Sequence, residues 1–193
     1  MSDHHSRMKT AALAGVLTIA ASSVAAGEIA DAATEAEALL TNGAPAEAWE
    51  LFDQATELFW AEAPLAFRAA LLAESVTGFG QFEPRETATY VVGDPLIVYL
   101  EPIGYGWTAI GNEFRVRLAV DIEIASDEGG LIASETDFAV IEHLGRTRSR
   151  EFQATIMMTI PQLPTGGYEL TLTLRDITTG KIAAAPVGFE IID

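Results

Sequence analysis

Two short segments concentrate the side chains with which this chain could recognise another molecule. The first, residues 101–107, follows an expected strand and places Glu101, Tyr105 and Trp107 among glycines. Aromatic rings exposed on such a loop suit stacking on a sugar or anchoring a partner protein. The alternative is that the rings fold inward and cover the core or neighbouring helices.

The second segment, residues 143–150, gathers positive charge in an otherwise acidic protein. It contains His143, Arg146 and Arg148, and guanidinium groups suit bidentate contacts with a carboxylate or a phosphate. Alternatively, the arginines neutralise nearby Glu and Asp side chains. No glycine-rich phosphate loop accompanies the segment, so the sequence does not indicate nucleotide chemistry.

The usual equipment for catalysis is scarce. Residues 27–193 hold no cysteine and a single histidine, His143, and no serine lies on a Gly-x-Ser-x-Gly turn. Asp121 and Glu123 share a strand face with arginines, which indicates a solvated face with cross-strand charge pairs. The turn at residues 127–130 lacks the alternating oxygen ligands of a calcium site. We therefore expect no enzymatic activity, no metal and no cofactor.

The N-terminus has the features of an export signal. Arg7 and Lys9 precede an uncharged run at residues 10–21, and the small residues 24–26 supply a cleavage position. We expect residues 1–26 to be removed and the protein to be periplasmic or secreted by a bacterium. A retained anchor is the alternative, but the run is short and rich in alanine for a membrane span. After cleavage, we expect that the mature protein is not an integral membrane protein.

Composition narrows the possible partners. The formal net charge of −17 repels phosphate backbones, which argues against nucleic-acid binding. A hydrophobic content of 49% is ample for a packed core. The oligomeric state does not follow from the sequence.

Residues 27–80 are predicted to form a helical hairpin and a linker. Asn42-Gly43 can end one helix, and Pro45 can begin the next. In the second helix a set of apolar residues follows steps of three and four and therefore shares one side. This set is Ala48, Trp49, Phe52, Ala55 and Phe59. Such a face must pack against something, and its own domain is the first expectation.

The remainder of this region is predicted to contain a short third helix and the linker. Pro64 can begin the helix, which would run through Leu72. Residues 75–80 then read as a linker between the two parts of the chain.

Residues 42–55 resemble a tetratricopeptide helix pair. The matching residues are Gly43 in the turn, followed by Ala48, Phe52 and Ala55 at the small, aromatic and small positions. Trp60 stands where that family usually has proline. Only one copy is present, whereas repeat arrays need several units. The resemblance therefore implies a helical hairpin and little about function.

Residues 81–193 show the period of two that is typical of half-buried strands. In the clearest case, apolar residues from Phe114 to Ile124 alternate with polar or small ones. Seven strands are expected, at residues 87–92, 95–101, 114–124, 131–141, 150–160, 168–174 and 189–191. Glycine and proline turns join them, as in a β-sandwich of about 100 residues.

Residues 164–172 and 175–181 resemble the last two strands of bacterial immunoglobulin-like domains. In that family a Pro-Gly-Tyr strand is followed by a hairpin with Asp and Gly-Lys, here at Tyr168, Asp176 and Lys181. The resemblance implies an immunoglobulin-like antiparallel β-sandwich. Together with the helical hairpin, this predicts an α+β chain with a short N-terminal hairpin and a sandwich of about seven strands.

These observations predict a non-catalytic, exported accessory or adaptor protein of the cell envelope. It would contact a partner protein chiefly through its sandwich loops, by way of the aromatic segment or the arginine segment. An exposed face of the helical hairpin is a further possible contact surface. The alternative is a carbohydrate- or small-ligand-binding module that uses the loop at residues 101–111.

Overall fold

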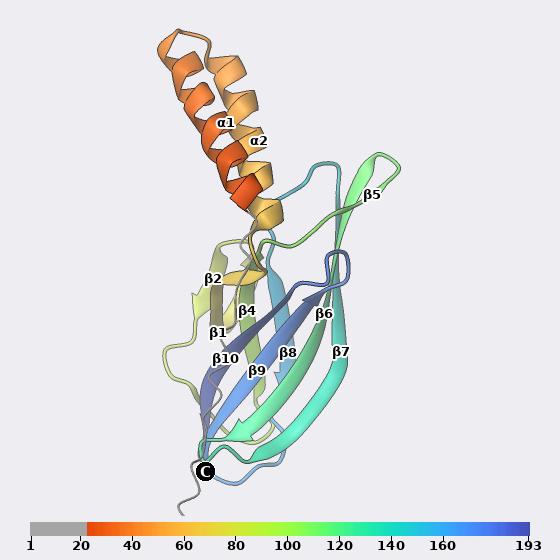
Figure 1. Ribbon diagram of the computed structural model, residues 1–193. Helices are drawn as coiled ribbons and strands as arrows, with labels where there is room; N and C mark the ends of the chain where they lie inside the picture. The colour runs from red at the N-terminus through yellow and green to blue at the C-terminus, as the bar shows by residue number, and fades with distance from the viewer. Residues whose placement is uncertain (1–22) are drawn as a thin grey trace, which may run out of the picture.

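The computed structural model describes residues 23–193, with side chains described from Gly27 onward. A helical hairpin of α1 (Ser23–Thr41) and α2 (Pro45–Glu62) projects from one end of a two-layered β-sandwich (Figure 1). The predicted α+β fold class is confirmed. The predicted export signal lies outside the described residues except for its last four positions, which belong to α1. Its cleavage therefore remains a prediction.

The turn between the two helices is closed as the sequence predicts. Gly43 has a φ of +79°, a left-handed conformation that glycine adopts without steric cost. This lets the Ala44 and Gly43 amides donate to the Leu39 and Leu40 carbonyl oxygens, at 3.0 and 3.2 Å. Pro45 is the first residue of α2, where its missing N–H leaves no bond unmade.

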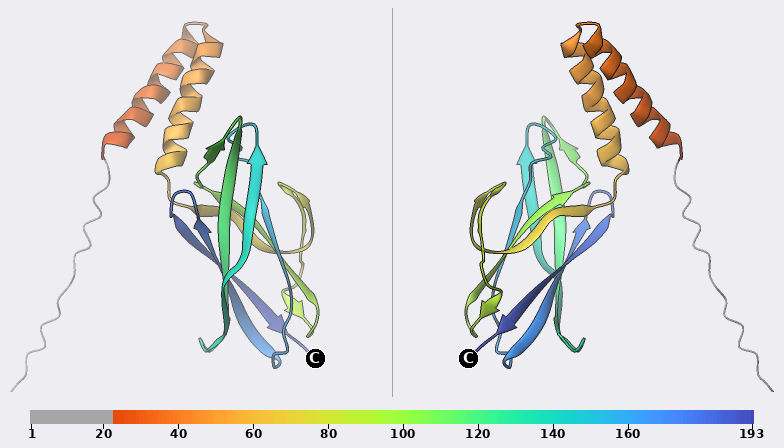
Figure 2. Two further views of the ribbon diagram at one scale, coloured as in Figure 1. Left: turned by 90° about the vertical axis from the view of Figure 1, so that its right-hand side faces the viewer. Right: turned by 90° about the vertical axis from the view of Figure 1, so that its left-hand side faces the viewer.

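The two helices pack against each other through small residues, among them Ala36, Ala48 and Ala55, which are buried. The apolar face of α2 was expected to pack on the sandwich, and this expectation was wrong for most of its length. Among the described residues, α2 contacts the sandwich near its C-terminal end, where Trp60 joins the core and Glu57 pairs with Arg148. The rest of the hairpin extends away from the sandwich (Figure 2). Within residues 23–193, neither helix combines the length and the apolarity that a bilayer span needs.

One sheet of the sandwich has the strand order β2-β1-β4-β8. Its strands are β1 (Ala66–Gly78), β2 (Gln81–Pro84), β4 (Pro95–Ile103) and β8 (Ala154–Thr159). All pairs in this sheet are antiparallel.

The other sheet has the order β3-β10-β9-β6, and β7 pairs with the other side of β6. Its strands are β3 (Thr89–Tyr90), β5 (Thr108–Ile110), β6 (Glu113–Ser126), β7 (Leu131–Gly145), β9 (Gly166–Asp176) and β10 (Ile182–Ile191). The short β5 pairs with the start of β6, and β3 is parallel to β10. All seven predicted strands are present, and β1, β2 and β5 are additional.

The core lies between the two sheets, as the alternating pattern predicts. The inward residues of the central strands are fully buried, including Leu96, Val98, Leu118, Val120, Leu170 and Leu172. Each such side chain contributes about 1.5–3 kcal/mol through removal of apolar surface from water. The sandwich is therefore the stable base from which the helical hairpin projects.

The predicted third helix at residues 64–72 and the linker at residues 75–80 were wrong. Most of these residues form β1, which pairs with β4 along one edge and with β2 along the other. The segment is rich in alanine and leucine, which favour helices in isolation. In the sandwich, pairing with β4 and burial of Ala73 override this local preference. The first strand of the sandwich therefore begins at Ala66.

Charged residues on the outer face of the second sheet form the expected cross-strand pairs. The Asp121 carboxylate accepts hydrogen bonds from Arg175 Nε and Nη2, at 2.8 and 3.0 Å. It also accepts the Asp137 amide at 2.8 Å, where the register of β7 against β6 shifts. Arg117 pairs with Glu142 at 3.1 Å. Hydrogen bonds from Arg175 hold the pKa of Asp121 below its ordinary value of 3.8.

This pair predicts a pH-dependent contribution to stability. Because the pKa of Asp121 is lower in the folded state, its stabilising effect is complete above about pH 5 and is lost as the pH falls through the ordinary pKa and then the lowered one. We expect Asp121→Asn to lower the free energy of unfolding at pH 7 and to flatten its decline below about pH 5. Urea titrations across this range measure both effects, with the exposed Glu128→Gln as control. Parallel acid profiles of Asp121→Asn and the native protein would contradict the assignment.

Candidate functional site

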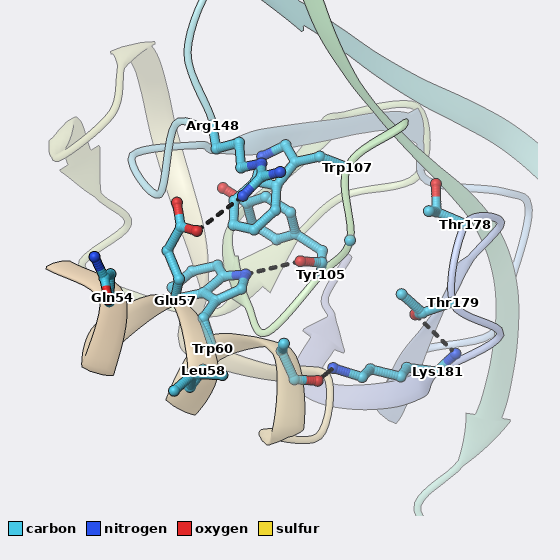
Figure 3. Close-up of a pocket in the computed structure, with 12 residues that line it drawn as sticks. Gln54, Glu57, Leu58, Trp60, Tyr105, Trp107, Arg148, Thr178, Thr179 and Lys181 are labelled. Carbon is cyan, nitrogen blue, oxygen red and sulfur yellow. Dashed lines mark hydrogen bonds and ion pairs between the residues drawn. The ribbon is translucent and has the colours of Figure 1, made fainter. Parts of the chain in front are cut away.

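The helical hairpin meets the sandwich at a junction built from three segments. These are the last turns of α2, the loop at residues 104–107 between β4 and β5, and the turn at residues 177–181 between β9 and β10 (Figure 3). Arg148 approaches from the segment between β7 and β8. Residues far apart in the sequence are therefore brought together here.

Trp60 is the side chain that carries α2 into the sandwich. Its Nε1 donates a hydrogen bond of 2.7 Å to the Tyr105 carbonyl oxygen (Figure 3). Its ring lies edge-to-face with Tyr105, with centroids 5.1 Å apart, and stacks on Trp107 at 5.6 Å. These geometries are the ones that aromatic pairs favour. The three rings form one packed cluster at the base of the helical hairpin.

Lys181 closes the same junction from the other side. Its Nζ donates to the carbonyl oxygens of Ala61, Ala63 and Gly104, at 2.7, 2.6 and 3.0 Å. The last carbonyls of a helix have no partners within the helix and carry partial negative charge. All three ammonium hydrogens are used, so a single lysine both caps α2 and ties it to the end of β4.

The glycines of the loop at residues 104–107 permit close approach of backbone segments. A Cβ on Gly104 would lie 2.3 Å from the Pro64 carbonyl oxygen, and one on Gly106 would lie 2.4 Å from Thr179 Cγ2. The Gly106 amide also donates to the buried Asp176 carboxylate at 2.7 Å. The glycine-aromatic composition of this loop therefore serves packing.

Asp176 organises the turn that presents Lys181. Besides the Gly106 amide, its carboxylate accepts the Thr178 amide at 2.8 Å and the Thr179 hydroxyl at 2.6 Å. The side chain is only 2% exposed, so these bonds replace its contacts with water. Its role at the junction was not predicted, although the Asp and Gly-Lys pattern marked the turn.

Glu101 and Tyr105 do not form the predicted recognition site. Tyr105 is 1% exposed, its hydroxyl donates to the Ser149 carbonyl oxygen at 2.9 Å, and burial raises the pKa of its phenol well above the usual range. Glu101 is 7% exposed and accepts a 2.5 Å hydrogen bond from Tyr99. Both side chains are occupied within the protein. Trp107 is half-buried, and both Tyr105 and Trp107 line the cavity at the junction, whereas Glu101 does not.

The arginine segment at residues 143–150 does not form the predicted anion-binding site either. His143 lies on β7 and not in a loop, with its ring 5.6 Å from that of Phe152. Arg148 forms an ion pair with Glu57 of α2 at 2.8 Å, and Arg146 is exposed. Neutralisation of a nearby carboxylate, the alternative interpretation, therefore holds for Arg148. The three side chains do not converge on one ligand position.

Two hollows remain as candidate binding sites. The junction cavity has a volume of about 550 Å³, and its lining includes Trp60, Trp107, Arg148 and Thr178. The second hollow, here called the hairpin groove, lies between α1 and α2 and has a volume of about 280 Å³. It is lined by Ala33, Ala36, Glu37, Leu40, Ala48, Trp49 and Phe52. Within the described residues, no group of three or more His, Cys, Asp or Glu side chains is placed to hold a metal ion.

The hairpin groove is bordered by large apolar side chains that face solvent. Trp49 is 66% exposed, Phe52 is 49% exposed, and Phe59 farther along α2 is 62% exposed. Sequence periodicity grouped these residues correctly on one side of α2. It did not reveal that α1 contributes mostly alanine to the helix pair and therefore leaves these rings uncovered.

The hydrogen bonds of Lys181 lead to a prediction about stability when its ammonium group is removed. We expect Lys181→Met, which keeps an apolar stem, to lower the free energy of unfolding by about 1–3 kcal/mol because two carbonyls at the end of α2 and the Gly104 carbonyl lose their donor. Limited proteolysis should become faster between Ala61 and Leu65. Urea titration and peptide mapping measure these effects, and the neighbouring exposed Ile182→Ala is the control. Unchanged stability together with unchanged cleavage would refute the role given to Lys181.

No family model matches the sequence, and no curated protein matches it. Among solved structures, it is similar to CopC from Methylosinus trichosporium OB3b, with a TM-score of 0.29, 15% identity, and coverage of 64% of this chain and 93% of that chain. A CARDB domain from Pyrococcus furiosus, in complex with di-metal ions, has a TM-score of 0.26 and 11% identity over 69% and 96% of the two chains. A chitin-binding domain from Burkholderia pseudomallei has a TM-score of 0.32 and 11% identity over 55% and 57%. Similarity at this level assigns neither a family nor a ligand, and both the tetratricopeptide and the immunoglobulin-like resemblances remain predictions.

Proposed function

We propose that this protein is a non-catalytic, exported accessory protein of the cell envelope that binds another protein through its helical hairpin. The observation that carries the proposal is the exposure of Trp49, Phe52 and Phe59 on a hairpin that projects from the sandwich. Contiguous exposed apolar side chains are typical of interaction sites, and aromatic residues dominate binding energy at interfaces.

The sandwich loops support this role less well than the sequence predicted. The aromatic loop is packed into the junction, and Arg148 is paired with Glu57. In this proposal the sandwich holds the hairpin at a fixed orientation, and the hairpin makes the contact. Export rests on the N-terminal sequence pattern alone.

Substitution of the exposed rings tests this function. We expect Trp49→Ala combined with Phe52→Ala to reduce capture of a stoichiometric partner by about 10-fold or more in cross-linking from the native envelope. Alanine is the strongest helix former, so the hairpin should remain folded, which circular dichroism checks. The control is Met157→Ala, which removes a side chain of similar exposure from the sandwich. Undiminished capture by the double variant would exclude the hairpin as the contact surface.

A second candidate function is binding of a carbohydrate or another small ligand at the junction cavity. Its volume lies within the range of about 300–1,000 Å³ that is common for ligand pockets. Trp107 lines this cavity, and its indole N–H, which neighbouring atoms cover, has no acceptor among the described residues.

Tryptophan fluorescence distinguishes this second candidate. If it is correct, soluble cell-wall glycan fragments should change the emission of the native protein and of Trp49→Ala, but not that of Trp107→Ala. An identical response of all three proteins, or no response in any, would count against a glycan site at the junction.

A further inference from the structure

The hairpin groove has the form of an incomplete helix bundle. Ala33 and Ala36 of α1 and Ala48 of α2 line it, while Leu40, Trp49 and Phe52 border it. Small residues allow a third backbone to approach closely, and larger residues on either side can interdigitate with its side chains. Trp49 and Phe52 lie edge-to-face with centroids 6.3 Å apart, so they form one continuous apolar wall.

The sandwich does not cover this groove. Trp49 precedes Trp60 by eleven residues, which corresponds to about 16 Å along the helix axis. The groove therefore lies toward the Asn42-Gly43 turn. The turn that joins the two helices is at the end of the hairpin away from the sandwich (Figure 2). Within residues 23–193, no strand or loop packs against it.

The charge of the helical hairpin restricts what can occupy the groove. Residues 23–63 contain no lysine or arginine and nine acidic residues, which are Glu28, Asp31, Glu35, Glu37, Glu47, Glu50, Asp53, Glu57 and Glu62. Of these, Glu57 alone forms an ion pair in the described structure. Glu37 lines the groove itself, and Asp53 directly follows Phe52.

A second copy of the hairpin is a poor match for this surface. Face-to-face association would bring two uncompensated acidic helix pairs together, and like charges across an interface oppose binding. An anionic lipid surface would be repelled for the same reason. A partner with positive charge beside an apolar stripe satisfies both features of the groove.

We propose that the hairpin groove binds an amphipathic helical segment of a basic protein, which completes a three-helix bundle with α1 and α2. This rests on the proposed function of the hairpin as a protein-binding element. Leucine or aromatic side chains of the partner enter between Leu40, Trp49 and Phe52. Flanking lysines or arginines lie against Glu37 and Asp53. The mode is that of an apolar helix face laid into a groove.

A matched pair of designed peptides tests the class of partner. Each has about 18 residues with leucines at helical spacings of three and four. One carries lysine at the polar positions and the other glutamate. We expect the full-length protein to bind the lysine peptide at least about 10-fold more tightly in fluorescence anisotropy, and this preference to shrink as salt is raised.

Variants then locate the binding surface. Trp49→Ala with Phe52→Ala should abolish binding of the lysine peptide. Glu37→Lys should weaken it several-fold, whereas Glu128→Lys, the same charge change at the exposed β6–β7 turn, should weaken it far less. Equal weakening by both charge changes would mean that the peptide responds to net charge and not to the groove, and would overturn the proposal.

The remaining outcomes separate this inference from the proposed function. Equal affinity for the two peptides refutes a basic helix but leaves protein binding by the hairpin intact. Capture from the envelope that persists in the double variant instead refutes the proposed function. If sedimentation shows a native dimer that Trp49→Ala dissociates, the occupant is a second copy and the basic partner is wrong.

Discussion

The position of the helical hairpin depends on one ammonium group. Covalently, α2 is joined to the sandwich only through Ala63, Pro64 and Leu65, a connection that would permit many orientations. Lys181 removes this freedom because its Nζ bonds the carbonyl oxygens of Ala61, Ala63 and Gly104 at once. Trp60 adds a second, apolar constraint on the same turn of helix. The charged hydrogen bonds of Lys181 and the buried indole of Trp60 therefore fix the orientation of α2 relative to the sandwich, although the connecting segment is short and irregular.

Much of the sandwich could be predicted from the sequence, because strands such as β6 have one apolar face that only one orientation can bury. β1 could not be predicted in this way. In its first part, from Ala66 to Ala73, six of eight residues are alanine or leucine, and residues on both faces are partly buried. Neither a period of two nor a polar face therefore marks this part as a strand. Its identity as a strand follows from non-local pairing with β4, which local sequence does not record.

Local sequence was also insufficient to identify which segments are available for binding. Glycines beside Tyr105 and Trp107 have a composition that suits either a recognition loop or a tightly packed one. What decides is the Pro64 carbonyl oxygen, which lies 2.3 Å from the position that a Cβ of Gly104 would occupy. That neighbour is forty residues away in the sequence. Conversely, periodicity grouped Trp49 with Phe52 and Phe59, but their exposure depends on how little of α2 the alanine-rich α1 can cover.

An apolar groove that stays uncovered needs protection from unwanted association, and the charge of the hairpin supplies it. Exposed aromatic side chains on a neutral helix pair would favour contact between copies of the protein. With nine carboxylates and no lysine or arginine in residues 23–63, such contacts are opposed by repulsion at every approach. The same field attracts a cationic surface and accelerates its encounter with the groove. The exposed apolar side chains and the acidic side chains of the hairpin therefore have compatible roles. Together they favour a basic partner and disfavour a second copy of the protein.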